Sequence, residues 1–154
     1  MYTEVLEKIK SSSLEQILLP KYYETFDDDN IESLYYIIPL IERLIIEYCD
    51  LTPNIIVENK EKDAFKTVGG LLEDNIISQE FGDELTENIL FIFKEDGIRN
   101  KLMHYSEDYL EIKLKRDELH MIKYTAFVLA YLYAKKADET NKKELEKIPL
   151  LGND

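Results

Sequence analysis

The sequence predicts an all-α protein, and three observations support that prediction. Glycine and proline are scarce, with 5 and 4 copies in 154 residues, so there are few helix-breaking residues. Apolar residues recur at the 3.6-residue helical period in several segments separated by short polar stretches. Strict apolar–polar alternation, the strand pattern, is confined to one short segment. The length and the 45% hydrophobic fraction are typical of one domain with a sizeable core.

Two helices are expected in the first third of the chain. The first spans about residues 3–19, and Pro20 stops it. The second spans about residues 30–50, and we interpret the acidic run 27–29 as its start, because carboxylates suit the positive end of a helix dipole. A metal site is the alternative for that run, but three consecutive aspartates point in different directions. Pro39 must kink or break the second helix, because proline lacks an N–H and its ring clashes with the preceding turn.

Two more helices are expected in the middle of the chain. The third spans roughly residues 62–78 and is weakened at Gly69 and Gly70. The fourth spans about residues 82–96, and Gly97 ends or bends it.

The C-terminal part combines the strand-like segment with the last helix. Residues 110–115 alternate in polarity, which predicts a short edge strand paired with residues 55–57. The last helix spans residues 117–137. It is apolar around most of its circumference, which indicates either a central helix or a subunit interface. Residues 139–154 are polar and are expected to form a flexible tail that frays.

These elements predict a single domain over residues 1–138, including the N-terminal segment 1–29. No segment reaches the roughly 20 apolar residues of a membrane span, and the N-terminus lacks the positive charge of a secretory signal. Cys49 is the only cysteine, so no intramolecular disulfide forms, and we expect it to be a small buried hydrophobe. A cytoplasmic location without membrane association is expected.

Acidic residues outnumber basic ones by 32 to 19, giving a formal net charge of -13. Such a charge argues against a basic nucleic-acid module and against docking on an anionic membrane. The excess is uneven, however: residues 1–93 hold 20 acidic and 7 basic side chains, whereas residues 94–154 hold 12 of each. RNA binding at the neutral segment is therefore not excluded by the net charge. The acidic surroundings predict that such binding is weak and strongly salt-dependent.

The neutral segment contains the one group of residues suited to catalysis. Arginine grips phosphate through two parallel N–H bonds, and histidine transfers protons near neutral pH. In a helix, Asn100 and His104 would be neighbours on one face, so the amide could fix the imidazole tautomer. Arg99 would lie about 140° around the helix from His104. The two converge if the helix begins irregularly near Gly97 or if a second chain contributes its own copy.

Two copies of Arg99 and His104 related by a two-fold axis would supply one general base, one general acid and two arginines that bind the phosphate. RNA supplies its own nucleophile, the 2′-hydroxyl, so neither a metal nor an enzyme nucleophile is needed. The plain alternative is structural: Arg99 pairs with Asp96 or Glu95, and His104 caps or packs.

Residues 99–104, Arg-Asn-Lys-Leu-Met-His, resemble the R-x4-6-H motif of the HEPN superfamily in its R-N-x-x-x-H form. Residues 38–44 and 67–72 extend the similarity to an uncharacterised family of bacterial HEPN-like domains, over roughly residues 30–135. Tyr105 departs from that pattern, in which a small residue often follows the histidine. The resemblance implies an all-α bundle of four to five helices, to which the alternating segment adds a short two-stranded edge element.

The resemblance also implies a function. Many HEPN domains are metal-independent endoribonucleases that act as homodimers in toxin–antitoxin and antiviral defence systems, without a cofactor. Carried onto this sequence, the catalytic residues are Arg99, His104 and Asn100. Glu42 and Tyr105 would support them, with a structural role favoured for Glu42. Basic residues expected to contact RNA are Lys101, Lys113, Lys115 and Arg116. For the last three, the alternative is the polar face of an edge strand.

Three functions therefore stay open. The first is a homodimeric endoribonuclease acting on an RNA substrate, with an antitoxin as a further partner. The second is a non-catalytic HEPN-like module that binds a nucleotidyltransferase or another defence partner. The third is a plain helical adaptor in which the motif is accidental.

Overall fold

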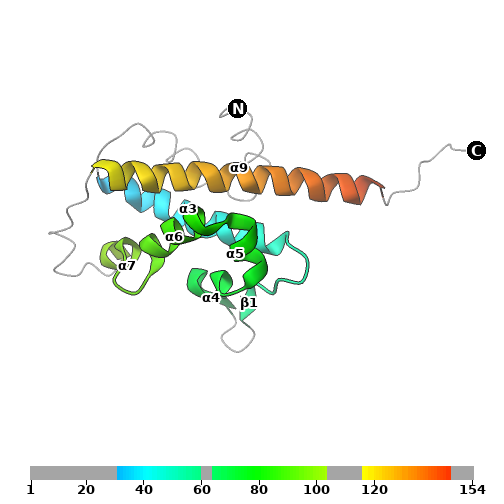
Figure 1. Cartoon of the computed structure of the whole chain (residues 1–154), viewed down its shortest axis with the longest axis horizontal. Helices are drawn as coiled ribbons and strands as arrows, with labels where there is room; N and C mark the ends of the chain where they lie inside the picture. The colour runs from blue at the N-terminus through cyan, green and yellow to red at the C-terminus, as the bar shows by residue number, and fades with distance from the viewer. Residues whose placement is uncertain (1–30, 60–63, 104–115, 147–154) are drawn as a thin grey trace, which may run out of the picture.

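The computed structural model describes residues 31–59, 64–103 and 116–146. Most of the described residues are helical, which confirms the all-α prediction (Figure 1). The expected first helix, the acidic run 27–29 and the alternating segment 110–115 lie outside the described residues.

Helix α3, Leu34–Asp50, is the central helix, and the 3₁₀ turn η1, Ile31–Ser33, leads into it. Its buried residues cover most of its circumference: Leu34, Ile37, Ile38, Leu40, Ile41, Leu44, Ile45, Ile46, Tyr48 and Cys49. The helix continues through Pro39 without breaking. Each fully buried aliphatic side chain contributes about 1.5–3 kcal/mol. The isoleucines and leucines around Pro39 thus offset the roughly 3 kcal/mol that a proline costs inside a helix.

Helix α9, Arg116–Glu146, lies along α3, and the two helices run in the same direction (Figure 1). It buries one stripe, formed by Leu119, Ile122, Ala126, Leu129, Ala130, Tyr133 and Ala134. Tyr124 and Tyr131 are exposed, so α9 is not the central helix of the described bundle. The last helix also continues beyond its expected end at residue 137, to Glu146. Residues 147–154 lie outside the description.

The expected third helix over 62–78 is confirmed only in part, because the described part of this segment holds a strand and two short helices instead of one helix. Strand β1, Glu58–Asn59, pairs antiparallel with β2, Ala64–Phe65, with Glu58 opposite Phe65. Helices α4, Val68–Leu72, and α5, Asn75–Phe81, follow. Two N-caps divide the segment, because Thr67 Oγ1 accepts from the Gly70 N–H at 3.1 Å and Asp74 Oδ1 accepts from the Ile76 N–H at 2.9 Å.

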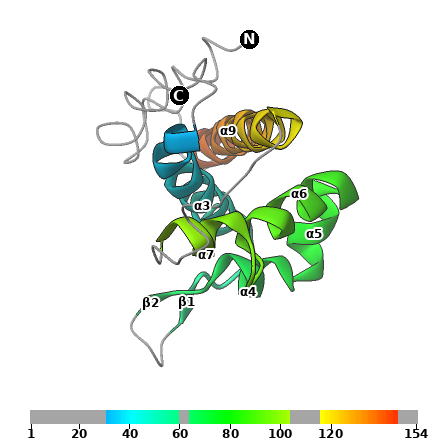
Figure 2. The same cartoon turned by 90° about the vertical axis from the view of Figure 1, so that its left-hand side faces the viewer.

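The small two-stranded element therefore exists, but it is local. It joins residues 58–59 to 64–65, whereas the predicted pairing joined 55–57 to 110–115. Residues 55–57 precede β1 and are not themselves a strand. The hairpin lies at the far end of the bundle from α9 (Figure 2).

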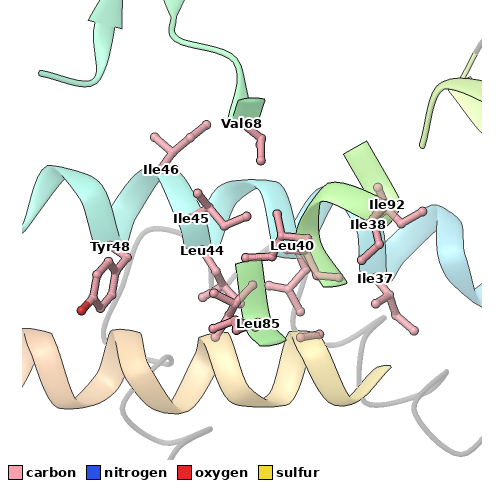
Figure 3. Close-up of a cluster of buried hydrophobic side chains, with 14 of the residues drawn as sticks. Ile37, Ile38, Leu40, Leu44, Ile45, Ile46, Tyr48, Val68, Leu85 and Ile92 are labelled. Atoms are coloured by element: carbon pink, nitrogen blue, oxygen red, sulfur yellow. The ribbon is translucent and has the colours of Figure 1, made fainter. Parts of the chain in front are cut away.

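Helix α6, Asp83–Phe93, and helix α7, Ile98–Met103, complete the described fold. Gly82 separates α5 from α6 with φ of 80°, a conformation that favours glycine. Helix α6 buries Leu85, Ile89 and Ile92 as its apolar spacing predicts, and it packs on both α9 and α7. Figure 3 shows how side chains of α3, α4 and α6 meet between the helices. Helix α7 packs on α6 and presents the motif segment.

Candidate functional site

A tight turn at Gly97 positions the motif segment. The Gly97 N–H donates to the Lys94 carbonyl at 2.8 Å, and the Gly97 carbonyl accepts from the Lys101 N–H at 3.2 Å. A Cβ at position 97 would lie 2.6 Å from the Ile92 carbonyl oxygen and 2.9 Å from that of Lys94. Both neighbours are backbone, so no side chain fits. Glycine thus allows α7 to begin one residue before Arg99.

Arg99 is held by two neighbours. Its Nη1 donates to Asn100 Oδ1 at 3.1 Å, and its Nη2 lies 3.9 Å from Glu42 Oε2 on α3. The Arg99 side chain keeps 33% of its surface exposed. The expected pairing of Arg99 with Asp96 or Glu95 is wrong: Glu42 provides the carboxylate, and Asp96 lies 3.8 Å from Lys94 instead.

Asn100 links the arginine to the turn. Its Nδ2 donates to the Glu95 carbonyl at 2.9 Å while its Oδ1 accepts from Arg99. The side chain therefore fixes the guanidinium relative to the α6–α7 connection. The expected bond from Asn100 to His104 cannot be followed, because His104 lies outside the described residues.

The structure thus brings together Arg99, Asn100 and Glu42 out of the predicted set. Lys101 is half-buried on α7, and Arg116 is the first residue of α9. His104, Tyr105, Lys113 and Lys115 lie outside the described residues.

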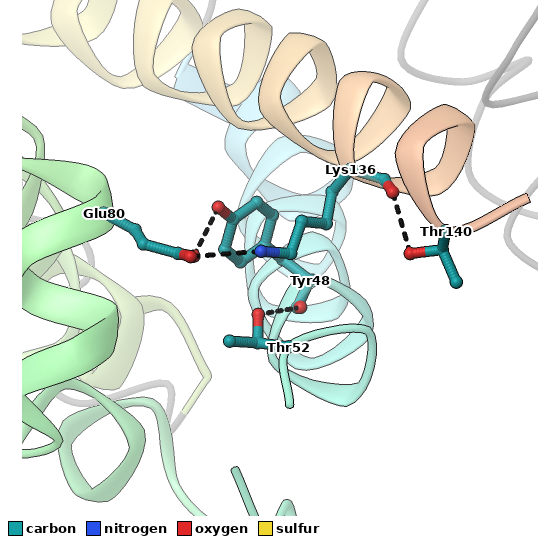
Figure 4. Close-up of polar contacts among 5 residues, drawn as sticks. All are labelled: Tyr48, Thr52, Glu80, Lys136 and Thr140. Carbon is teal, nitrogen blue, oxygen red and sulfur yellow. Dashed lines mark hydrogen bonds and ion pairs between the residues drawn. The ribbon is translucent and has the colours of Figure 1, made fainter. Parts of the chain in front are cut away.

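The structure also contains a partly buried polar cluster that the sequence did not indicate, the Tyr48–Glu80–Lys136 cluster (Figure 4). The Tyr48 hydroxyl donates to Glu80 Oε2 at 2.6 Å, and Lys136 Nζ donates to Glu80 Oε1 at 3.0 Å. Lys136 Nζ also lies 5.4 Å from the centroid of the Tyr48 ring. These contacts join α3, α5 and α9. Sequence patterns missed them because they connect residues 32 and 56 positions apart.

Burial and charge shift the pKa values in this region. Burial alone would raise the pKa of Glu80, but the hydrogen bonds from Tyr48 and Lys136 outweigh it and lower that pKa below its ordinary value. Burial raises the pKa of Tyr48, and its hydrogen bond to Glu80 adds to the effect. Burial raises the pKa of Cys49 to about 12, with smaller contributions from Asp74 and Glu80. Cys49 is fully buried, as its place on an apolar helix face predicted.

The described part of the chain contains neither a candidate metal cluster nor a candidate membrane span. Over residues 31–59, 64–103 and 116–146, no three His, Cys, Asp or Glu side chains are grouped as a metal would require. None of the helices in these ranges combines the length and the apolar character needed to cross a membrane.

Comparisons with known proteins give no match. No family model matches the chain, and neither a curated protein nor a solved structure is significantly similar to it.

Proposed function

We propose that the chain is a metal-independent endoribonuclease of HEPN type, acting as a homodimer with Arg99 and His104 at a composite site. The observation that carries the proposal is the placement of Arg99. Its side chain is one-third exposed, its guanidinium bonds to Asn100, and it lies five residues before His104. An arginine held in this way is suited to grip a phosphodiester.

In the proposed reaction, one imidazole accepts the proton of the RNA 2′-hydroxyl, and the freed oxygen attacks the adjacent phosphorus. The bond from phosphorus to the 5′-oxygen breaks, and a second imidazole donates a proton to that oxygen. The products are a 2′,3′-cyclic phosphate and a 5′-hydroxyl. Arg99 from each copy stabilises the charge that develops on the phosphate oxygens.

The test compares Arg99→Gln with Arg43→Gln. Arg43 is a matched control: it is a partly exposed arginine on α3 that pairs with Glu47 at 2.7 Å. Cleavage of a mixed-sequence RNA is measured in EDTA, with 2′-deoxy RNA as the negative substrate. The proposal predicts at least a hundredfold loss for Arg99→Gln, a wild-type rate for Arg43→Gln and no cleavage of the deoxy substrate. Equal rates for the two variants would contradict it.

A second candidate is a non-catalytic HEPN-like module that binds a protein partner, for example a nucleotidyltransferase. The observation that favours it is Glu42, whose carboxylate lies 3.9 Å from Arg99 and lowers the local positive potential toward RNA. This candidate predicts no cleavage in the assay above but a stable complex on co-purification from the native host.

A further inference from the structure

A half-open pocket of about 270 Å³ lies between α5–α6 and α9, on residues separate from the Arg99 site. It is lined by Glu80, Phe81, Glu84, Leu85, Asn88, Tyr124, Thr125, Val128 and Leu132. The volume falls just below the usual range for drug-sized ligands, so it suits a small molecule or a single long side chain.

The lining combines apolar walls with polar groups, three of which have no partner within the described part of the chain. Phe81, Leu85, Val128 and Leu132 supply the apolar part. Glu84, Asn88 and Tyr124 make no side-chain hydrogen bond or ion pair within the described part of the chain. Tyr124 is 61% exposed, so the face of its ring is open to a ligand.

On the α5–α6 side of the pocket the charged side chains have one sign, and Lys136 on α9 pairs with Glu80. Residues 75–93, which hold α5 and α6, carry four acidic side chains and no lysine or arginine. No basic residue lines the pocket. The site is therefore electrostatically suited to a cation, and its apolar walls are suited to a hydrocarbon stem.

The neighbouring Tyr48–Glu80–Lys136 cluster already binds such a group. There a lysine stem packs between helices, its ammonium bonds to Glu80 at 3.0 Å and lies 5.4 Å from a tyrosine ring. The pocket lining likewise contains a carboxylate, Glu84, and a tyrosine, Tyr124, and none of its lining residues is a lysine. Carboxylates and tyrosine rings together are an established environment for organic cations.

We propose that this pocket binds an organic cation, a guanidinium or ammonium group carried on a short apolar stem. The cation comes either as a free small molecule or as an arginine or lysine side chain of a partner polypeptide. The pocket and the Arg99 site share no residue, so cation binding here does not depend on the proposed ribonuclease activity.

The test uses the full chain with methyl NMR at Leu85 and Val128. The probes are N-butylguanidinium, the neutral isostere N-butylurea, and a five-residue acetylated peptide with one arginine between leucines. We expect saturable shifts at both methyl groups with the two cations and none with butylurea. Glu84→Gln should weaken binding two- to fivefold, as loss of an exposed ion pair does. Tyr124→Leu should weaken it to a similar extent through loss of the ring face.

Glu87→Gln is the matched control, because Glu87 is an exposed carboxylate on α6 that does not line the pocket. It should leave binding unchanged. A peptide that binds at least tenfold more tightly than butylguanidinium supports a partner side chain, and equal binding supports a free cation. Absent shifts, equal binding of butylurea, or equal effects of the Glu84 and Glu87 variants would overturn the proposal.

Discussion

Nη2 of Arg99 lies 3.9 Å from Oε2 of Glu42, so the start of α7 is connected electrostatically to the middle of α3. Both side chains are about one-third exposed. At that exposure an ion pair contributes about 0–1 kcal/mol to stability. Under the proposed function, the main effect of Glu42 is therefore on how strongly Arg99 binds phosphate.

Glu42→Gln should strengthen RNA binding two- to fivefold at low salt, because it removes a negative charge beside the guanidinium that grips phosphate. Glu47→Gln is the control, since Glu47 lies on the same helix and pairs with Arg43. Fluorescence anisotropy with a short RNA measures both. If the two variants bind RNA equally, Glu42 does not act on Arg99.

Gly97→Ala should lower the free energy of unfolding by about 1–3 kcal/mol, because its Cβ would lie 2.6 Å from a backbone carbonyl oxygen. Gly69→Ala provides the opposite case. Position 69 is helical, nothing lies within 4 Å of the added Cβ, and alanine should stabilise by about 0.5–1 kcal/mol. Urea unfolding of both variants measures whether the two changes in stability have opposite signs. If both variants are destabilised to a similar extent, the turn at Gly97 is not tight.

Glu80 should make stability depend on pH. Its pKa is lower in the folded chain than in the unfolded chain, so the carboxylate stabilises the fold above the unfolded value near 4.5. That contribution is lost as pH falls through the folded pKa. Urea unfolding of wild type and Glu80→Gln from pH 7 to pH 3 should give a stability difference that narrows below about pH 4.5. A constant difference would mean that the Tyr48 and Lys136 bonds do not stabilise the charged form.

Cys49 should be inert in the native protein. It is fully buried, and burial raises its pKa to about 12, so little thiolate forms at pH 8. A disulfide reagent at pH 8 should react at least a hundredfold faster in 6 M guanidinium chloride than in buffer. Rapid native labelling would show that α3 opens readily.

The helical class and the burial of α3 follow from composition and apolar spacing, because those signals are local. The middle of the chain was predicted less well. The apolar spacing of residues 62–78 indicated one helix, but the side chains of Thr67 and Asp74 cap two separate helices there. Pro39 does not break α3 either, because the burial of the side chains around it keeps the helix intact.

The candidate site was predictable in part. Arg99 and Asn100 were named from their motif, and Glu42 was named only as a supporting residue with a structural role favoured. Spacing alone favoured Asp96 or Glu95 as the partner of Arg99, because the position of α3 against α7 is a tertiary property. The Tyr48–Glu80–Lys136 cluster and the pocket beside it depend on contacts between distant helices, which no single segment encodes.

The most direct measurement is RNA cleavage in EDTA by the purified full chain and by His104→Ala, with the product ends identified. The account predicts 2′,3′-cyclic phosphate and 5′-hydroxyl ends from the wild type and at least a hundredfold loss in the variant. Undiminished cleavage by His104→Ala would contradict the proposed mechanism.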